Sequence, residues 1–218
     1  YKMLAAFEKV NKIKFLSIFI LTVQYGFTSS ITESWSSVGF EKKILNSITL
    51  DIEQSLRTKD NISSFKQTFT EASFSYSLHN GLKIFIPVRY AVFNEKIKKR
   101  ISLGFSYKYD FKPFTLKYRS KFQRSFQKDK IFDPLARNKL AIDYKINKKV
   151  KPYLSGEVFH FINSDQYEND EKRWSIGLNM SFSKKKKIKV FHTYKIEGIN
   201  KSNPDKTNVI GLAYTLKL

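Results

Sequence analysis

The chain has 218 residues, a length that fits one domain, with no cysteine and a formal net charge of +21. Its 16% aromatic content excludes a disordered chain, and its mean hydropathy of −0.40 excludes a protein with several membrane-spanning helices. Because cysteine is absent, disulfide scaffolds and thiolate metal sites are excluded as well.

The excess of basic residues does not indicate nucleic-acid binding. A nucleic-acid-binding protein usually concentrates its charge in a patch, an arm or one helix. Here the 40 Lys and Arg residues are spread through the whole chain, on alternate positions of segments that are otherwise apolar. We therefore expect no nucleic-acid partner. Genomic base composition is an alternative source of part of the lysine excess.

The N-terminus is typical of a secretory signal peptide. Three lysines precede the short apolar run at 15–23, and small residues follow it at 28–30. Signal peptides combine a basic region, a short apolar region and small residues at the cleavage site. We predict a signal peptide over residues 1–30. An uncleaved anchor and a buried strand are the alternatives for the apolar run.

Beyond residue 30 the apolar residues recur with period two. In the segment 98–109, Ile101, Leu103 and Phe105 alternate with small or polar residues. Successive side chains of a strand point to opposite faces, so this pattern predicts a β-strand with one apolar and one polar face. The same alternation recurs in the segments 48–57, 114–123, 173–182 and 209–218.

About ten long strands are predicted, and twelve are also compatible with the pattern. They span 47–57, 64–78, 82–92, 98–109, 114–126, 136–146, 151–162, 172–183, 187–197 and 207–218, each long enough to cross a bilayer. A shorter strand near 35–41 lies in an N-terminal segment of residues 31–46. Short turns, such as that at Asn80-Gly81, alternate with longer polar loops. The sequence thus predicts an all-β, antiparallel up-and-down transmembrane β-barrel over residues 47–218.

The alternation alone also fits a soluble β-protein of the periplasm with its apolar face inside. Three features favour a membrane barrel. Aromatic residues lie near strand ends on the apolar face, as in interfacial belts. The polar face mixes small residues with Arg and Glu, which suits a narrow lumen, and the last residue still belongs to a strand. We therefore predict a monomer in the cell outer membrane, with outer-membrane lipid and the barrel-assembly machinery as partners.

Several short motifs in these strands are defined by single Arg, Glu, Tyr or Gly residues at particular positions. They are Trp35 to Lys43, Leu50 to Arg57, Glu71 to Tyr76, Pro87 to Tyr90, Arg137 to Tyr144, Pro152 with Glu157, and Arg173 to Gly177. This pattern resembles the predicted outer-membrane proteins of Bacteroidetes grouped as DUF2490, over nearly the whole chain after residue 30. The resemblance implies an outer-membrane barrel of a Gram-negative cell without an established activity. Leu218 departs from the aromatic residue with which such barrels commonly end.

No constellation of catalytic or metal-ligating residues is visible in the sequence. His79, His160 and His192 lie in a turn and on two different strands, and neither zinc-ligand spacing nor a Gly-rich phosphate loop occurs. We expect no enzymatic activity, no cofactor and no metal. A lipid-acting barrel enzyme that uses His160 or His192 with a strand serine is the alternative.

The polar face supplies the candidate site. If it points inward, it lines the lumen with a ladder of charges: Arg57, Arg89, Arg100, Arg119, Arg137, Arg173, Glu53, Glu71, Asp143 and Glu157. Because an unpaired charge is costly in a narrow interior, we expect the arginines at 57, 89, 137 and 173 to pair with these four acids on neighbouring strands. The ladder predicts a structural or a narrow, anion-leaning permeability role. A surface interaction protein that uses its outer loops at 127–135 and 163–171 is the alternative.

Overall fold

The computed structural model describes residues 32–128, 130–162 and 170–218 of the chain. The predicted signal peptide lies outside these ranges. Within them, no helix is long and apolar enough to cross a membrane.

Twelve strands and one short 3-10 turn make up the described fold. The strands are β1 (Thr32–Lys43), β2 (Ile48–Lys59), β3 (Ser64–Ser77), β4 (Leu82–Val92), β5 (Ile97–Phe111), β6 (Phe114–Gln127), β7 (Lys130–Ile131), β8 (Leu135–Tyr144), β9 (Val150–Phe161), β10 (Glu171–Ser181), β11 (Lys186–Glu197) and β12 (Asp205–Lys217), and the turn is η1 (His79–Gly81). Apart from β7, every strand has at least the roughly 9–11 residues that a tilted strand needs to cross a bilayer.

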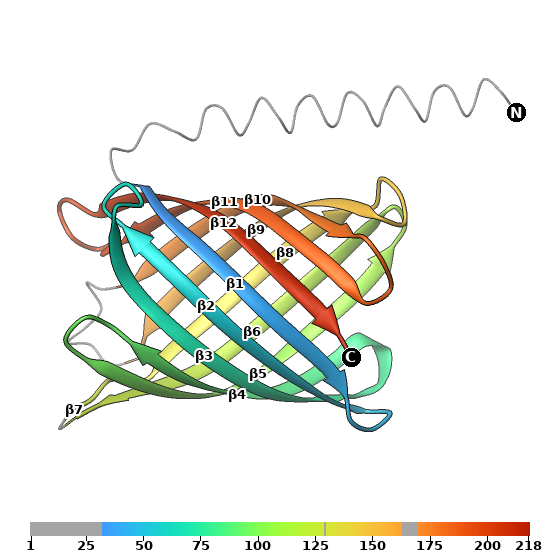
Figure 1. Cartoon of the computed structure of the whole chain (residues 1–218), viewed down its shortest axis with the longest axis horizontal. Coiled ribbons are helices and arrows are strands. Elements are labelled where there is room, and N and C mark those ends of the chain that lie inside the picture. The colour runs from blue at the N-terminus through green and yellow to red at the C-terminus, as the bar shows by residue number, and fades with distance from the viewer. Residues whose placement is uncertain (1–31, 129, 163–169) are drawn as a thin grey trace, which may run out of the picture.

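Eleven of the strands close into a barrel (Figure 1). Neighbouring strands follow the order β5-β4-β3-β2-β1-β12-β11-β10-β9-β8-β6, and the pairing of β5 with β6 completes the ring. The two-residue strand β7 pairs only with β6. The predicted all-β barrel is therefore confirmed, and the number of strands lies between the ten and twelve that the sequence allows.

The N-terminal segment differs from its prediction. The sequence places residues 31–46 outside the barrel, whereas β1 is a strand of 12 residues that pairs with both β2 and β12. The described barrel thus begins at Thr32 instead of residue 47. The period-two signal is weak here because Ser34 and Ser36 occupy the outward positions while Trp35 lines an interior cavity.

One neighbouring pair of strands is parallel. Strand β1 runs parallel to β12, with Thr32 opposite Asn208 and Glu41 opposite Lys217, whereas the other neighbouring pairs are antiparallel. An odd number of strands imposes this pair, because the first and last strands then run in the same direction. Barrels of bacterial outer membranes usually have an even number of strands. The barrel is antiparallel as predicted, except at this seam between β1 and β12.

The two ends of the barrel carry different connections. The turns that follow β1, β3, β5, β8 and β10 lie at one end, together with Leu218; we call this end the turn rim (right in Figure 1). The connections that follow β2, β4, β6, β9 and β11 lie at the other end, the loop rim, where the described chain begins at Thr32. The longest connections between barrel strands, 128–134, 162–170 and 198–204, all belong to the loop rim. Short turns at one rim and longer loops at the other match the predicted arrangement.

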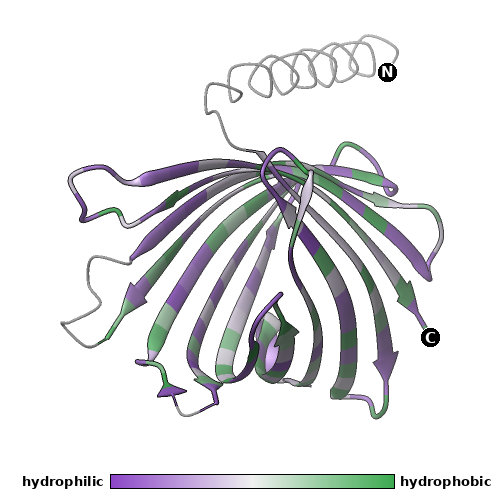
Figure 2. Cartoon of the chain, turned by 60° about the vertical axis from the view of Figure 1, so that its left-hand side comes forward, coloured by the Kyte–Doolittle hydropathy of each residue, from purple (hydrophilic) through white to green (hydrophobic). Residues whose placement is uncertain are grey.

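The apolar residues face outward and the polar residues face inward. Thirty-four large hydrophobic side chains are exposed among the described residues, including Leu103, Leu140 and Trp174 at 53–57%. Only five hydrophobic side chains are buried, against sixteen polar or charged ones. Figure 2 shows the resulting alternation of hydrophobic and hydrophilic bands along the strands. A soluble barrel has the reverse distribution, so this surface favours contact with lipid.

A group of aromatic rings lies on the outer wall next to the turn rim. Tyr109, Phe111, Phe114 and Tyr144 form a continuous row, with successive ring centroids 5.9, 5.7 and 5.3 Å apart. Aromatic rings at this height are typical of the girdles that flank the apolar band of a membrane barrel.

Candidate functional site

The candidate site is the interior of the barrel. A cavity of about 440 Å³ opens near the turn rim, a second of about 400 Å³ extends from there to the middle, and a third of about 150 Å³ lies towards the loop rim. Side chains from strands on opposite walls line each of them, so these cavities together form the lumen.

Four arginines separate the second cavity from the third. Arg57 on β2, Arg89 on β4, Arg137 on β8 and Arg173 on β10 line both cavities, and no other residue does so. We call this group the arginine layer. Any solute that moves from one cavity to the other must pass these guanidinium groups.

Aromatic rings lie between the guanidinium groups of the arginine layer. Each ring contacts two arginines, with its centroid 3.7–5.0 Å from the guanidinium carbons. In order of contact the stack runs Arg89, Phe69, Arg57, Trp35, Arg173, Phe159 and Arg137. Cation–π contacts contribute about 0.5–2 kcal/mol each, so the rings hold the guanidinium planes in place while their edges remain free for hydrogen bonds.

The structure brings together two of the expected Arg–carboxylate pairs. Arg89 lies directly opposite Glu71 on β3 and donates from Nε at 2.7 Å, with Nη2 2.6 Å from the same carboxylate oxygen. Arg137 on β8 donates to both oxygens of Glu157 on β9, at 2.5 and 3.0 Å. Both are charge-assisted pairs across neighbouring strands, and the second is bidentate.

The other two arginines of the layer do not pair with a carboxylate on a neighbouring strand. Arg173 donates to Glu171, two residues away on the same face of its own strand. Arg57 makes no ion pair among the described residues, and its buried Nε has no hydrogen-bond partner. Glu53 lies on the same face of β2, but four residues correspond to about 13 Å along a strand. This distance is too great for a contact with Arg57.

The remaining predicted site residues lie around the arginine layer. Arg119 approaches Glu157 at 3.3 Å, although its buried Nε has no partner. Arg100 donates to the Ser125 hydroxyl at 3.0 Å. Asp143 pairs with Lys117 on β6, so its partner is a lysine instead of the expected arginine.

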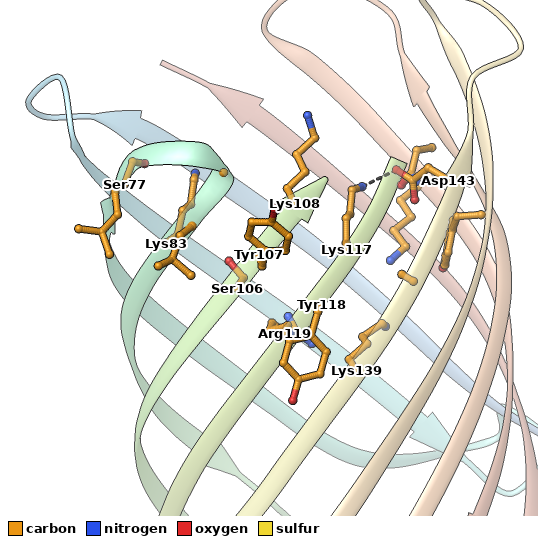
Figure 3. A pocket seen from close by; sticks show the side chains of 17 residues that line it. Ser77, Lys83, Ser106, Tyr107, Lys108, Lys117, Tyr118, Arg119, Lys139 and Asp143 are labelled. Carbon is orange, nitrogen blue, oxygen red and sulfur yellow. Dashed lines mark hydrogen bonds and ion pairs between the residues drawn. The ribbon is translucent and has the colours of Figure 1, made fainter. Parts of the chain in front are cut away.

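A basic cavity occupies the lumen at the turn rim (Figure 3). Its basic lining consists of Lys83, Lys108, Lys117, Arg119, Lys139 and Lys189, whereas Asp143 is the only acidic residue among the described ones that line it. Figure 3 shows Lys83, Lys108, Lys117, Arg119 and Lys139 on the neighbouring strands β4, β5, β6 and β8, with the ion pair between Lys117 and Asp143 at one side. The positive character of the lumen therefore continues to the turn rim.

A network around Glu33 was not predicted from the sequence. Glu33 on β1 is only 4% exposed and accepts hydrogen bonds from Trp35 Nε1 at 2.9 Å, Lys66 Nζ at 2.6 Å and Lys195 Nζ at 3.0 Å. Through Trp35, this network positions one ring of the arginine–aromatic stack. Sequence reasoning missed it because it placed residues 31–46 outside the barrel.

The inward aromatic residues were also missed. Trp35, Phe69 and Phe159 line the cavities around the arginine layer, whereas the sequence pattern predicts aromatic residues on the outer face. A signal was present, because Phe69 and Phe159 are each two residues from an inward glutamate, Glu71 or Glu157, and thus share its face.

The two histidines named for the enzyme alternative, His160 and His192, lie on different strands. His160 Nδ1 is 2.6 Å from Asp170, and His192 Nε2 is 3.0 Å from Asn208. They lie on β9 and β11, with β10 between them. Within the described ranges, no three His, Cys, Asp or Glu side chains come together as a metal site requires.

Two acids of the predicted outer loop at 163–171, Asp170 and Glu171, are engaged within the barrel. Asp170 is 4% exposed, and its carboxylate also accepts a hydrogen bond from the Phe161 backbone N–H at 2.8 Å. Glu171 points into the lumen towards Arg173. The other two acids of this loop, Asp165 and Glu168, lie outside the described ranges.

Fold and site together define a small closed β-barrel with an apolar outer wall and a basic lumen. The chain belongs to the family described as protein of unknown function DUF2490, whose sequence profile matches residues 32–207. This assignment agrees with the resemblance seen in the sequence motifs. A search of curated proteins finds no match.

Solved structures of outer-membrane porins have a similar fold. The NanC porin in a rhombohedral crystal form matches with a TM-score of 0.50 at 10% identity, over 75% of this chain and 86% of the porin. The KdgM porin in complex with disordered oligogalacturonate gives 0.48 at 13% identity, over 74% and 82%. The anion-selective porin from Comamonas acidovorans gives 0.41 at 9% identity, over 79% of this chain and 54% of that porin. At these identities the likeness concerns the fold alone.

Proposed function

We propose that this protein is a small, non-enzymatic barrel of a Gram-negative outer membrane, and that small anions pass through its narrow basic lumen. The outward apolar face supports the membrane location, because thirty-four exposed large hydrophobic side chains require an apolar surrounding. The porin-like fold supports the same location.

One observation carries the preference for anions. The two cavities that meet at the arginine layer are lined by ten basic residues and by three acidic ones, Glu53, Glu71 and Glu171. Within a low-dielectric wall, such an excess raises the local concentration of anions and excludes cations.

Conductance in planar lipid bilayers under a salt gradient tests this function. We expect a small current whose reversal potential has the sign of anion selectivity. Arg100→Glu should reduce that selectivity, because it reverses one lumen charge and breaks only the hydrogen bond to Ser125. Arg124→Glu, an exposed position at the opposite parity of β6, is the matched control and should leave the selectivity unchanged.

Two results would contradict the proposal. If the bilayer recordings show no current, the charged lumen has only a structural role, in which the arginine–aromatic stack stabilises the barrel. Recovery of the protein in the soluble periplasm after cell fractionation would contradict the membrane location itself.

A further inference from the structure

We infer that Arg57 is a binding site for the carboxylate group of a small hydroxylated organic anion inside the lumen. This inference deepens the proposed function, and it rests on that function only for how the anion reaches the site. The site comprises the Arg57 guanidinium and the two cavities that meet there.

Within the described residues, Arg57 is the one member of the arginine layer that has no carboxylate partner. Glu71, Glu157 and Glu171 each occupy the edge of one of the other three guanidinium groups. The Nε of Arg57 is buried and has no hydrogen-bond partner. Since this atom is enclosed, a bound carboxylate would accept hydrogen bonds from the terminal Nη groups of Arg57, which lines both cavities.

The guanidinium of Arg57 is held ready for such a ligand. Its central carbon lies 3.9 Å from the centroid of Trp35 and 5.0 Å from that of Phe69. Trp35 is itself fixed by its hydrogen bond to Glu33 at 2.9 Å. Little conformational entropy is then lost when an anion docks, and the planar group can engage both oxygens of a carboxylate at once.

The surrounding space sets the size and the other polar groups of the ligand. The cavity on the loop-rim side of Arg57 is about 150 Å³, close to the volume of five water molecules at about 30 Å³ each. The side-chain amides of Gln67 and Gln123 also line it, and both residues are buried. Amides can both donate to and accept from hydroxyl groups, so a short hydroxy acid fits this cavity better than an apolar acid.

Trp35 provides a readout next to the site. In full-length protein folded in detergent, the Trp174→Phe change leaves Trp35 as the only tryptophan, and glycerate and glycerol are then titrated at constant chloride concentration. These probes differ only in a carboxylate against a hydroxymethyl group. We expect a saturable change of fluorescence with glycerate and no such change with glycerol.

Substitutions at Arg57 test the assignment. Arg57→Gln should weaken glycerate binding by at least tenfold, and Arg57→Lys should weaken it less, because lysine keeps the charge but not the two parallel N–H groups. Arg124→Gln makes the same chemical change on the outer wall and should have no effect. The shift between folded and boiled protein on a gel checks that each variant folds. If Arg57→Gln does not fold, the glycerate affinity of Arg57→Lys is compared with that of the wild-type protein instead.

The inference is overturned if glycerate acts no differently from glycerol, or if the substitutions of Arg57 leave the titration unchanged. The titration does not require the anion to pass through the barrel, so its result is independent of the channel proposal. Anion-selective currents without an Arg57-dependent titration would refute the binding site alone. The titration without any current would refute the channel alone.

Discussion

Replacing Arg137 by leucine removes the best-satisfied cation of the arginine layer. In the folded barrel its two hydrogen bonds to Glu157 measure 2.5 and 3.0 Å, and its guanidinium carbon lies 4.6 Å from the centroid of Phe159. Glu157 is only 5% exposed, so water cannot replace the lost donor easily. The substitution therefore leaves a buried carboxylate without its main partner.

The expected cost follows from these contacts. Removing one member of a buried ion pair costs about 3–5 kcal/mol. Arg119 remains 3.3 Å from the same carboxylate and offsets part of the loss, which places Arg137→Leu near the lower limit, at about 3 kcal/mol. Adding Glu157→Gln to the variant should restore about half, because the neutral amide no longer needs a cation while Arg119 loses its anionic partner.

Urea unfolding of the protein in detergent micelles, followed by tryptophan fluorescence, measures this change. The temperature at which the folded band disappears from an unboiled gel gives an independent reading. Lys184→Leu, in the exposed turn after β10, is the control. It should change the free energy of unfolding by less than about 0.5 kcal/mol, as is usual for a surface position. If Arg137→Leu destabilises the barrel no more than Lys184→Leu, the ion pairs of the lumen do not brace the fold.

Three further predictions concern the seam, the packing of the lumen and the outer wall. Lys217→Met removes the ion pair to Glu41 that joins β12 to β1. Because both side chains are about 30% exposed, the free energy of unfolding should fall by only about 0.5–1 kcal/mol, and this loss should vanish in about 1 M salt. A loss of stability that does not change with salt would contradict this prediction. Gly211→Ala places a Cβ 1.9 Å from a ring atom of Phe191, so the ring must move. The free energy of unfolding in urea should fall by about 1–3 kcal/mol. An unchanged urea midpoint would show that the ring moves at no cost. Trp174 is 57% exposed, so lipids with brominated acyl chains should quench its fluorescence, and Trp174→Phe should abolish the quenching because the other tryptophan lines the lumen. Quenching that persists in this variant would place the lipid contact elsewhere.

The faces of the strands could be predicted from the sequence because they depend only on local alternation. The side chains of Arg89 and Glu71 were assigned to the lumen in this way, and both line it. Their partners depend in addition on the register between strands, which no local pattern encodes. Arg89 meets Glu71 because these residues are directly opposite, whereas Arg57 has no carboxylate partner in the part of the chain that the structure describes.

The place of β1 in the ring could not be predicted for a related reason. The strand β1 carries serine outward and tryptophan inward, so its alternation does not separate apolar from polar residues. Its place in the barrel depends on β12, at the other end of the described chain. The number of strands, and with it the parallel seam, is a property of the whole chain and is absent from any single segment.

The parallel seam has a consequence for how the barrel folds. The paired residues Glu41 and Lys217 are separated by 176 positions, so bringing them together costs roughly 2.5 kcal/mol more loop-closure entropy than closing a loop of about ten residues. The hairpins along the chain form at lower entropic cost, and we expect ring closure to be the last step. Until then β1 and β12 are both edge strands with unpaired backbone groups, which can pair with another molecule. Refolding yield should therefore fall with increasing protein concentration, most steeply for variants that weaken the contact between these two strands.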